Sequence, residues 1–160
     1  MTDEYTTLKS EQLDRIKQRD GFLNLNVVAV GIVVAIAVRT DGSTSAWLLI
    51  PWITTIMGWA YLSNDDKVSA IARHIRAAPP TTGALHSWEV GPKGLLPVPV
   101  RRYADILIYL LSFAFPTPAA IILYANNHAW SFATVLLATL EVLLSVSLVA
   151  MYLFSVQRRK

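Results

Sequence analysis

Long stretches of this sequence carry no charged side chain. Residues 21–38 and 43–64 have none, and residues 106–140 form a third run that is too long for one membrane crossing. A helix that rises about 1.5 Å per residue needs about 20 apolar residues to cross about 30 Å of hydrocarbon. Charged residues make up only 16% of the chain, against about 25% in typical soluble proteins. The pattern therefore predicts an integral membrane protein.

The third run divides at the polar turn Asn126-Asn127-His128, which leaves four spans. We expect an all-α fold, a four-transmembrane-helix bundle that forms a single membrane domain over residues 1–160. Proline removes a backbone donor and clashes with the preceding turn, so Pro116 and Pro118 predict a kink in the third span. The expected segments are a helical extension at 1–20, spans at 21–38, 44–64, 104–124 and 130–156, an amphipathic helix and proline-rich loop at 65–103, and a tail at 157–160.

The basic residues predict the orientation of the spans. Of the 14 Lys and Arg, only Arg39 falls between the first and second spans, and none falls between the third and fourth. The side of the membrane that carries the excess of Lys and Arg near the span ends is normally the cytoplasmic side. We therefore expect a multi-pass protein with both termini and residues 65–103 in the cytoplasm.

The segments between the spans are expected to be partly helical. Residues 10–20 are rich in helix formers and should run as a helix into the first span. Asn64-Asp65-Asp66 can cap an amphipathic helical extension that lies along the inner membrane surface. The prolines and glycines of residues 77–100 argue against regular helix there. The candidate lipid- or partner-binding surface comprises Lys67, Arg73, Arg76, Arg101 and Arg102.

Glu141 is a formally charged residue well inside a span, near the expected midplane of the bilayer. A bare carboxylate there costs about 2.5–3.5 kcal/mol on insertion scales, so the group should be protonated, hydrogen-bonded or in water. Small and polar residues share its helical face, which should therefore contact protein. Hydroxyl groups, Tyr109 among them, are its candidate partners. The candidate intramembrane polar site comprises Glu141, Thr134, Ser145, Thr54, Thr55 and Ser112.

Two further features of the spans favour helix packing. Asn24 and Asn26 lie near the start of the first span, where Gly31 and Ala35 follow at small-xxx-small spacing, a pattern typical of closely packed membrane helices. Asp105, beside two arginines at the start of the third span, is expected to act as a cap or in a local ion pair.

Motifs of catalysis are missing from the sequence. The chain has no cysteine, which excludes disulfides and a thiol nucleophile. His74, His86 and His128 are too far apart in the expected topology to bind one metal ion, and no phosphate-binding loop, nucleophile elbow or dinucleotide fingerprint occurs. We expect no catalytic, cofactor-binding or metal site, no enzyme activity, and no nucleic-acid binding, since the basic residues sit beside spans.

Three stretches carry a resemblance to a known group of proteins: SEQLDRIKQRDGF (10–22), LLIPWITTIMGWAYLSNDD (48–66) and KVSAIARHIR (67–76). They are similar to small four-helix integral membrane proteins of actinobacteria, over roughly residues 10–76. That group has no assigned activity. The resemblance therefore implies a bacterial inner membrane and no catalytic residues.

Three functions remain open at this point. The first is a non-enzymatic bundle that self-associates as a homo-oligomer, a membrane effector or pore subunit that responds to a cytoplasmic protein partner. Small four-helix effectors of bacterial anti-phage systems are similar in design. The second is a small proton- or cation-coupled transporter or channel that uses Glu141. The third is a structural membrane scaffold in which a neutral Glu141 holds the helices in register.

Overall fold

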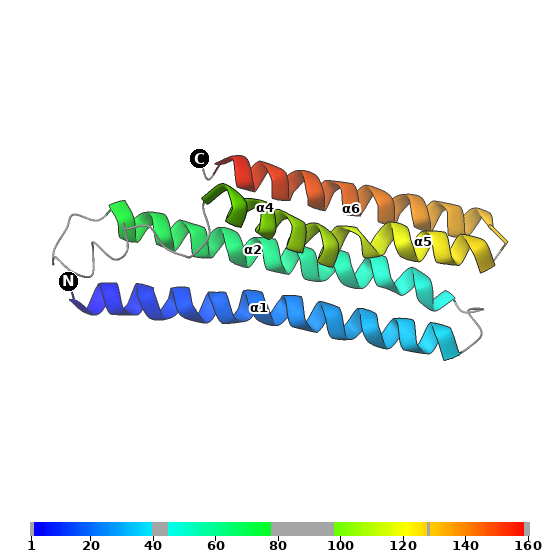
Figure 1. The fold of residues 1–160 in the computed structure, drawn as a ribbon, viewed down its shortest axis with the longest axis horizontal. Coiled ribbons are helices and arrows are strands. Elements are labelled where there is room, and N and C mark those ends of the chain that lie inside the picture. Colours follow the sequence, from blue (N-terminus) through cyan, green and yellow to red (C-terminus); the bar gives the residue numbers. More distant parts are fainter. Residues whose placement is uncertain (1, 40–44, 78–97, 128, 159–160) are drawn as a thin grey trace.

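The computed structural model describes residues 2–39, 45–77, 98–127 and 129–158, and these parts are helical apart from short connections. Four helices in them are long and apolar enough to cross a membrane, which supports the expected all-α, multi-pass architecture. Helix α1 begins and α6 ends at one end of the bundle, here called the terminal end; the other is the turn end (Figure 1). The elements are α1 (Thr2–Arg39), a 3-10 turn η1 (Ser45–Leu48), α2 (Leu49–Ala77), α4 (Val98–Tyr109), a π-helical turn η2 (Leu110–Ala114), α5 (Pro116–Asn127) and α6 (Phe132–Arg158).

Helices α1 and α2 are longer than one membrane crossing requires. The expected extension and the first span form one unbroken helix, and α2 continues to Ala77. The expected helical extension after the second span is present, but Asn64-Asp65-Asp66 do not cap it, because these residues lie inside α2. Asn64 and Asp65 are buried, and their side chains bond to Gln18 and Arg19 of α1. Because these side chains bond to α1, they do not end the helix. The resulting α1–α2 hairpin reaches past the ends of α4 and α6 (Figure 1).

We call this protruding part of the hairpin, residues 2–17 and 67–77, the stalk. Gln12 of α1 and Ile75 of α2 are buried in it. Apolar and neutral residues on the facing sides thus continue the packing of the two helices beyond the rest of the bundle. Figure 1 shows no bend in α2 that would turn the stalk sideways.

The apolar core is divided into two clusters along the bundle. The turn-end cluster is made of Val33, Ala37, Trp47, Leu48, Ile50, Ala120 and Tyr124. The terminal-end cluster is made of Leu62, Tyr109, Phe113, Leu148, Tyr152 and Val156.

Close packing in the terminal-end cluster depends on a glycine. A Cβ atom on Gly58 of α2 would lie 2.6 Å from Cδ2 of Leu148 and 3.3 Å from Cβ of Phe113. In the same cluster the rings of Tyr109 and Tyr152 stack with their centroids 3.8 Å apart. Helix α2, turn η2 and helix α6 therefore interlock at this level of the bundle.

The third span is interrupted at the place where the prolines predict a kink. Phe115 N–H donates to the carbonyl of Leu110 at 2.8 Å, the i to i+5 bond of a π-helical turn. Pro116 has no N–H, so the carbonyl of Ser112, four residues earlier, loses its usual helical partner. Nδ2 of Asn26 on α1 donates to that carbonyl at 2.7 Å.

Candidate functional site: a buried carboxyl group

Glu141 lies inside the bundle on α6 and is only 1% exposed. It falls between Leu137, which packs against the turn-end cluster, and Leu148 of the terminal-end cluster. Neither carboxyl oxygen has a hydrogen-bond partner among the residues that the structure describes. The indole N–H of Trp52 on α2 approaches the carboxyl, but outside normal hydrogen-bond geometry. Glu141 thus faces protein, as expected, without the hydroxyl partners that were expected.

Three other residues of the predicted polar site are also buried inside the bundle. Thr54 and Thr55 on α2 are buried, and so is Ser145, one turn after Glu141 on α6. The hydroxyl of Thr54 donates to the carbonyls of Ile50 and Pro51, at 3.0 and 3.1 Å, within its own helix. These small polar groups lower the apolar character of the bundle interior without neutralising the carboxyl.

Thr134 has a different role from the one predicted. It lies in the first turn of α6, where its hydroxyl accepts a hydrogen bond from Ser131 N–H at 2.8 Å. In return, the Ser131 hydroxyl accepts one from Thr134 N–H at 3.2 Å. This reciprocal arrangement is a capping box, which satisfies N–H groups at the start of the helix. Ser112 is likewise engaged through its carbonyl at η2 rather than through its hydroxyl.

Thr117 is a buried polar residue that the sequence reasoning missed. It is 1% exposed, and its hydroxyl has no partner within the described part of the chain. It follows Phe113 by one turn on α5, while Ser145 precedes Leu148 by about one turn on the antiparallel α6. Since Phe113 and Leu148 both meet Gly58, a rise of about 1.5 Å per residue puts Thr117 level with Ser145, about one turn from Glu141. Thr117 lies on the same helical face as the buried Phe113 and Ala120, and this spacing was the sequence pattern that could have predicted its burial.

The two asparagines of α1 point in different directions. Asn26 is 1% exposed and binds the carbonyl of Ser112, while its own Oδ1 has no partner in the described residues. Asn24 is exposed. Gly31 and Ala35 are also exposed, and a Cβ atom on Gly31 would meet nothing within 4 Å. The predicted small-residue stripe therefore makes no helix contact within the described chain.

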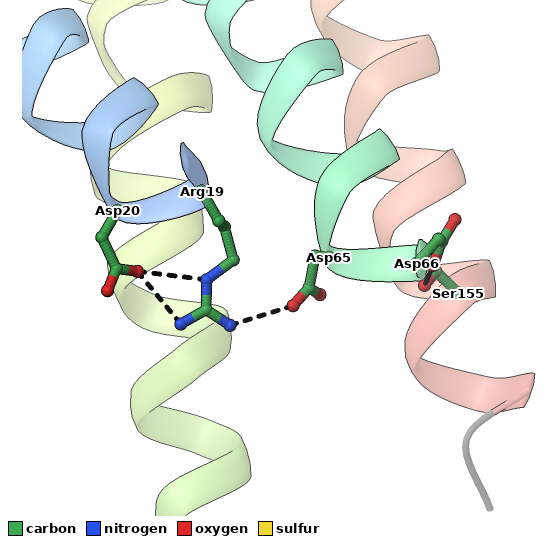
Figure 2. Close-up of polar contacts among 5 residues, drawn as sticks. All are labelled: Arg19, Asp20, Asp65, Asp66 and Ser155. Carbon is green, nitrogen blue, oxygen red and sulfur yellow. Dashed lines mark hydrogen bonds and ion pairs between the residues drawn. The ribbon is translucent and has the colours of Figure 1, made fainter. Parts of the chain in front are cut away.

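A network of charged residues joins three helices at the terminal end (Figure 2). The Arg19 guanidinium of α1 bonds Asp20 and, across to α2, Asp65, each at 3.1 Å. Next to Asp65, the carboxylate of Asp66 accepts a hydrogen bond at 2.6 Å from the hydroxyl of Ser155 on α6. The sequence showed these charges but not their pairing, which depends on the register between α1 and α2.

The predicted basic surface is only partly described by the structure. Lys67, Arg73 and Arg76 are exposed on the stalk. They continue the line of α2, so the expectation of a helix turned along a surface finds no support in the helix path (Figure 1). The side chains of Arg101 and Arg102 lie outside the described residues, as does any pairing of them with the exposed Asp105.

The described residues contain no group of three or more His, Asp or Glu that could hold a metal ion, and His86 and His128 lie outside them. No protein-family model matches the chain, and no curated protein and no solved structure matches it significantly. Glu141, a buried acid with no ion pair to any residue that the structure describes, is the group whose chemistry points to a function.

Proposed function

We propose that this protein is a small, non-enzymatic, multi-pass membrane protein that binds and releases a proton or cation at Glu141, as the coupling site of a transporter or channel. The observation that carries the proposal is the 1% exposure of Glu141 together with two carboxyl oxygens that lack partners in the described chain. Acidic residues inside membrane spans commonly mark ion or proton pathways. We place the protein in a bacterial inner membrane with the stalk in the cytoplasm, in line with the Lys and Arg bias.

The bonding of the carboxyl favours exchange over a structural role. A neutral carboxyl that holds helices in register would donate its proton to an acceptor on a neighbouring helix, since a buried group left unpaired costs about 1–3 kcal/mol. Glu141 makes no such bond to a described residue. Its protonated form suits the closed, apolar interior, and its ionised form requires water or a cation. A change in occupancy of this site is thus coupled to a change in the surroundings of the carboxyl.

The test is proton and potassium flux into liposomes that contain the purified protein. We expect flux in the wild type and its loss in Glu141→Gln, which keeps the shape of the side chain but cannot ionise. Glu4→Gln is the matched control, because Glu4 is exposed on the stalk, and it should retain full flux. Equal flux in the wild type and Glu141→Gln, or no flux in the wild type, would overturn the proposal.

A second candidate function is a membrane effector that responds to a cytoplasmic partner, and the stalk favours it. The stalk exposes Lys67, Arg73 and Arg76 beyond the ends of α4 and α6. An effector would depolarise cells that express it together with its partner. Replacing Arg73 and Arg76 by glutamate should then abolish the effect while Glu141→Gln leaves it intact, the reverse of what proton coupling requires.

A further inference from the structure

Four buried residues that follow one another along the bundle carry polar atoms without a partner among the residues that the structure describes. They are Tyr109, Asn26, Thr117 and Glu141, each 1% exposed. A buried polar group that is left unpaired destabilises a protein. In native proteins such groups are usually satisfied by buried water molecules. These four residues are therefore candidates for water binding inside the bundle.

The order of the four residues leads from the terminal end to Glu141. The Tyr109 hydroxyl lies within electrostatic range of the Asp65 carboxylate, which belongs to the network of Figure 2. Asn26 of α1 meets the third span at the π-helical turn, between Tyr109 and Thr117. From Tyr109 to Thr117 this span rises about 12 Å, and Thr117 lies about one turn from Glu141, at about 1.5 Å per residue. The unpaired groups thus cover the distance between the network and the carboxyl.

This line of polar groups passes beside a tightly packed apolar layer. At the level of Gly58, Phe113 and Leu148 close the interior between α2, η2 and α6. Asn26 reaches the carbonyl of Ser112, the neighbour of Phe113 in sequence, from the α1 side. A polar contact therefore crosses the same level of the bundle next to the apolar layer.

The unpaired buried group of the turn-end cluster has a different chemistry. It is the indole N–H of Trp47, which has no partner in the described chain. An indole donates a hydrogen bond and accepts none, whereas tyrosine and threonine hydroxyls do both. Protons move along hydrogen bonds only through groups that accept one proton and release another. The unpaired hydroxyls on the terminal-end side of Glu141 meet this requirement, and the indole of Trp47 does not.

The spacing of the unpaired oxygens distinguishes a proton from a metal ion. Hard cations bind several oxygen ligands around one point. Here the oxygens follow one another along the bundle, and the described residues contain no group of three or more acids or histidines that could hold a metal. A proton needs only one acceptor at a time. The arrangement therefore favours the proton.

We propose that Glu141 takes up and releases protons through a line of water molecules held by Tyr109, Asn26 and Thr117, which opens at the terminal end. This inference rests on the proposed exchange at Glu141, and it names the proton as the exchanged species. In each transfer a hydroxyl or a water accepts one proton and gives up its own, and the last proton binds the ionised carboxylate of Glu141. The hydroxyls of Tyr109 and Thr117 relay the proton, and Oδ1 of Asn26 positions a water between them.

Hydrogen–deuterium exchange of the Glu141 carboxyl tests this line without measuring flux. The infrared C=O band of the protonated carboxyl, assigned by its loss in Glu141→Gln, shifts when deuterium replaces the proton, so its rate of change after transfer to heavy water is the readout. Tyr109→Phe and Thr117→Val each remove a hydroxyl and keep the shape of the side chain. We expect each to slow the exchange by about tenfold, less than the loss of a general acid or base, because water can partly replace a hydroxyl. Tyr103→Phe and Thr139→Val, at exposed positions of α4 and α6, are the matched controls and should leave the rate unchanged.

The other outcomes are equally specific. Trp47→Phe should leave the rate unchanged, and slower exchange in this variant would overturn the assignment of the line to the terminal end. An unchanged rate in either Tyr109→Phe or Thr117→Val would overturn the relay. Potassium flux that is lost in Glu141→Gln would overturn the proton as the exchanged species.

The exchange rate also separates this inference from the proposed function. Slower exchange in the two hydroxyl variants of a protein without flux would reject the proposed function and support the line. Proton flux that depends on Glu141, together with an unaltered exchange rate in these variants, would reject the line and support the proposed function.

Discussion

Asn26 of α1 donates a hydrogen bond of 2.7 Å to the main-chain carbonyl of Ser112, at the point where Pro116 leaves that carbonyl without a helical partner. A side chain of one helix thereby satisfies a main-chain carbonyl of another helix that has no partner within its own helix. Polar side chains commonly satisfy backbone groups freed by proline in membrane helices, which is why such breaks are tolerated there.

This repair predicts a specific coupling between two substitutions. Asn26→Leu should destabilise the protein by about 0.6–2 kcal/mol, the range for a hydrogen bond between membrane helices. In a Pro116→Ala background the same substitution should cost less, because the Ser112 carbonyl then has its own N–H. The free energy of unfolding in mixed detergent micelles is measured for the wild type, for each single variant and for the double variant. Equal costs of Asn26→Leu in both backgrounds would show that the two residues are independent.

Gly58 should resist any larger side chain. In Gly58→Ala the new Cβ would lie 2.6 Å from Leu148 and 3.3 Å from Phe113, and overpacking of this kind typically costs about 1–3 kcal/mol. Gly31→Ala is the matched control, since open space surrounds Gly31 and alanine favours helix over glycine by up to about 1 kcal/mol. The midpoint temperature of thermal unfolding in detergent should therefore fall for Gly58→Ala and not for Gly31→Ala. A similar shift in both variants would contradict the interlock.

The Arg19–Asp65 pair should contribute more to stability than the exposed Lys17–Asp14 pair. Arg19→Ala removes the ion pair at 3.1 Å to the carboxylate of Asp65, whose side chain is 10% exposed. Hydrogen bonds to charged groups contribute about 1.5–3 kcal/mol, so a loss of that order is expected in unfolding measurements. Lys17→Ala removes an exposed pair with Asp14 at 3.8 Å and should cost about 0–1 kcal/mol. Equal effects of the two substitutions would show that the network of Figure 2 is solvated and weak.

Glu141→Leu separates a functional carboxyl from a structural one. If Glu141 lacks partners, a leucine of similar size should raise the free energy of unfolding by about 0.5–2 kcal/mol, as often happens when a functional polar group is removed from an interior. If the carboxyl holds helices in register, the same substitution should lower it. Unfolding measured beside the flux assay gives both results on one preparation, with Glu4→Gln as the unchanged reference.

Local patterns in the sequence were sufficient to predict the membrane-spanning helices, but they were insufficient to predict which side chains of these helices contact one another. Uncharged length alone predicts the four spans, and Glu141 stands out because a charge inside a span is rare. The Asn64-Asp65-Asp66 segment resembles a helix cap, but its side chains bond to Gln18 and Arg19 of α1 and the helix continues. Whether the helix ends or continues at this segment depends on the register between α1 and α2, which the sequence of one helix alone does not show.

The same limit applies to the residues of the candidate site. Thr134 shares the spacing of the face that carries Glu141, yet it lies in the first turn of α6 and bonds to Ser131, because the exact start of the helix decides its role. Asn24 and Asn26 are the same residue type, two positions apart on α1. Only the direction in which α1 faces α2 and η2 makes one of them exposed and the other a donor to Ser112.

The unbroken length of α1 gives the molecule a mechanical property. From Thr2 to Arg39 the helix contains no proline and no interruption, so it behaves as a single stiff rod with the stalk at one end and Asn26 along its length. A stiff rod passes a twist or a push from one end to the other instead of absorbing it. A force applied to the stalk would therefore reach the hydrogen bond from Asn26 to Ser112 along one continuous helix.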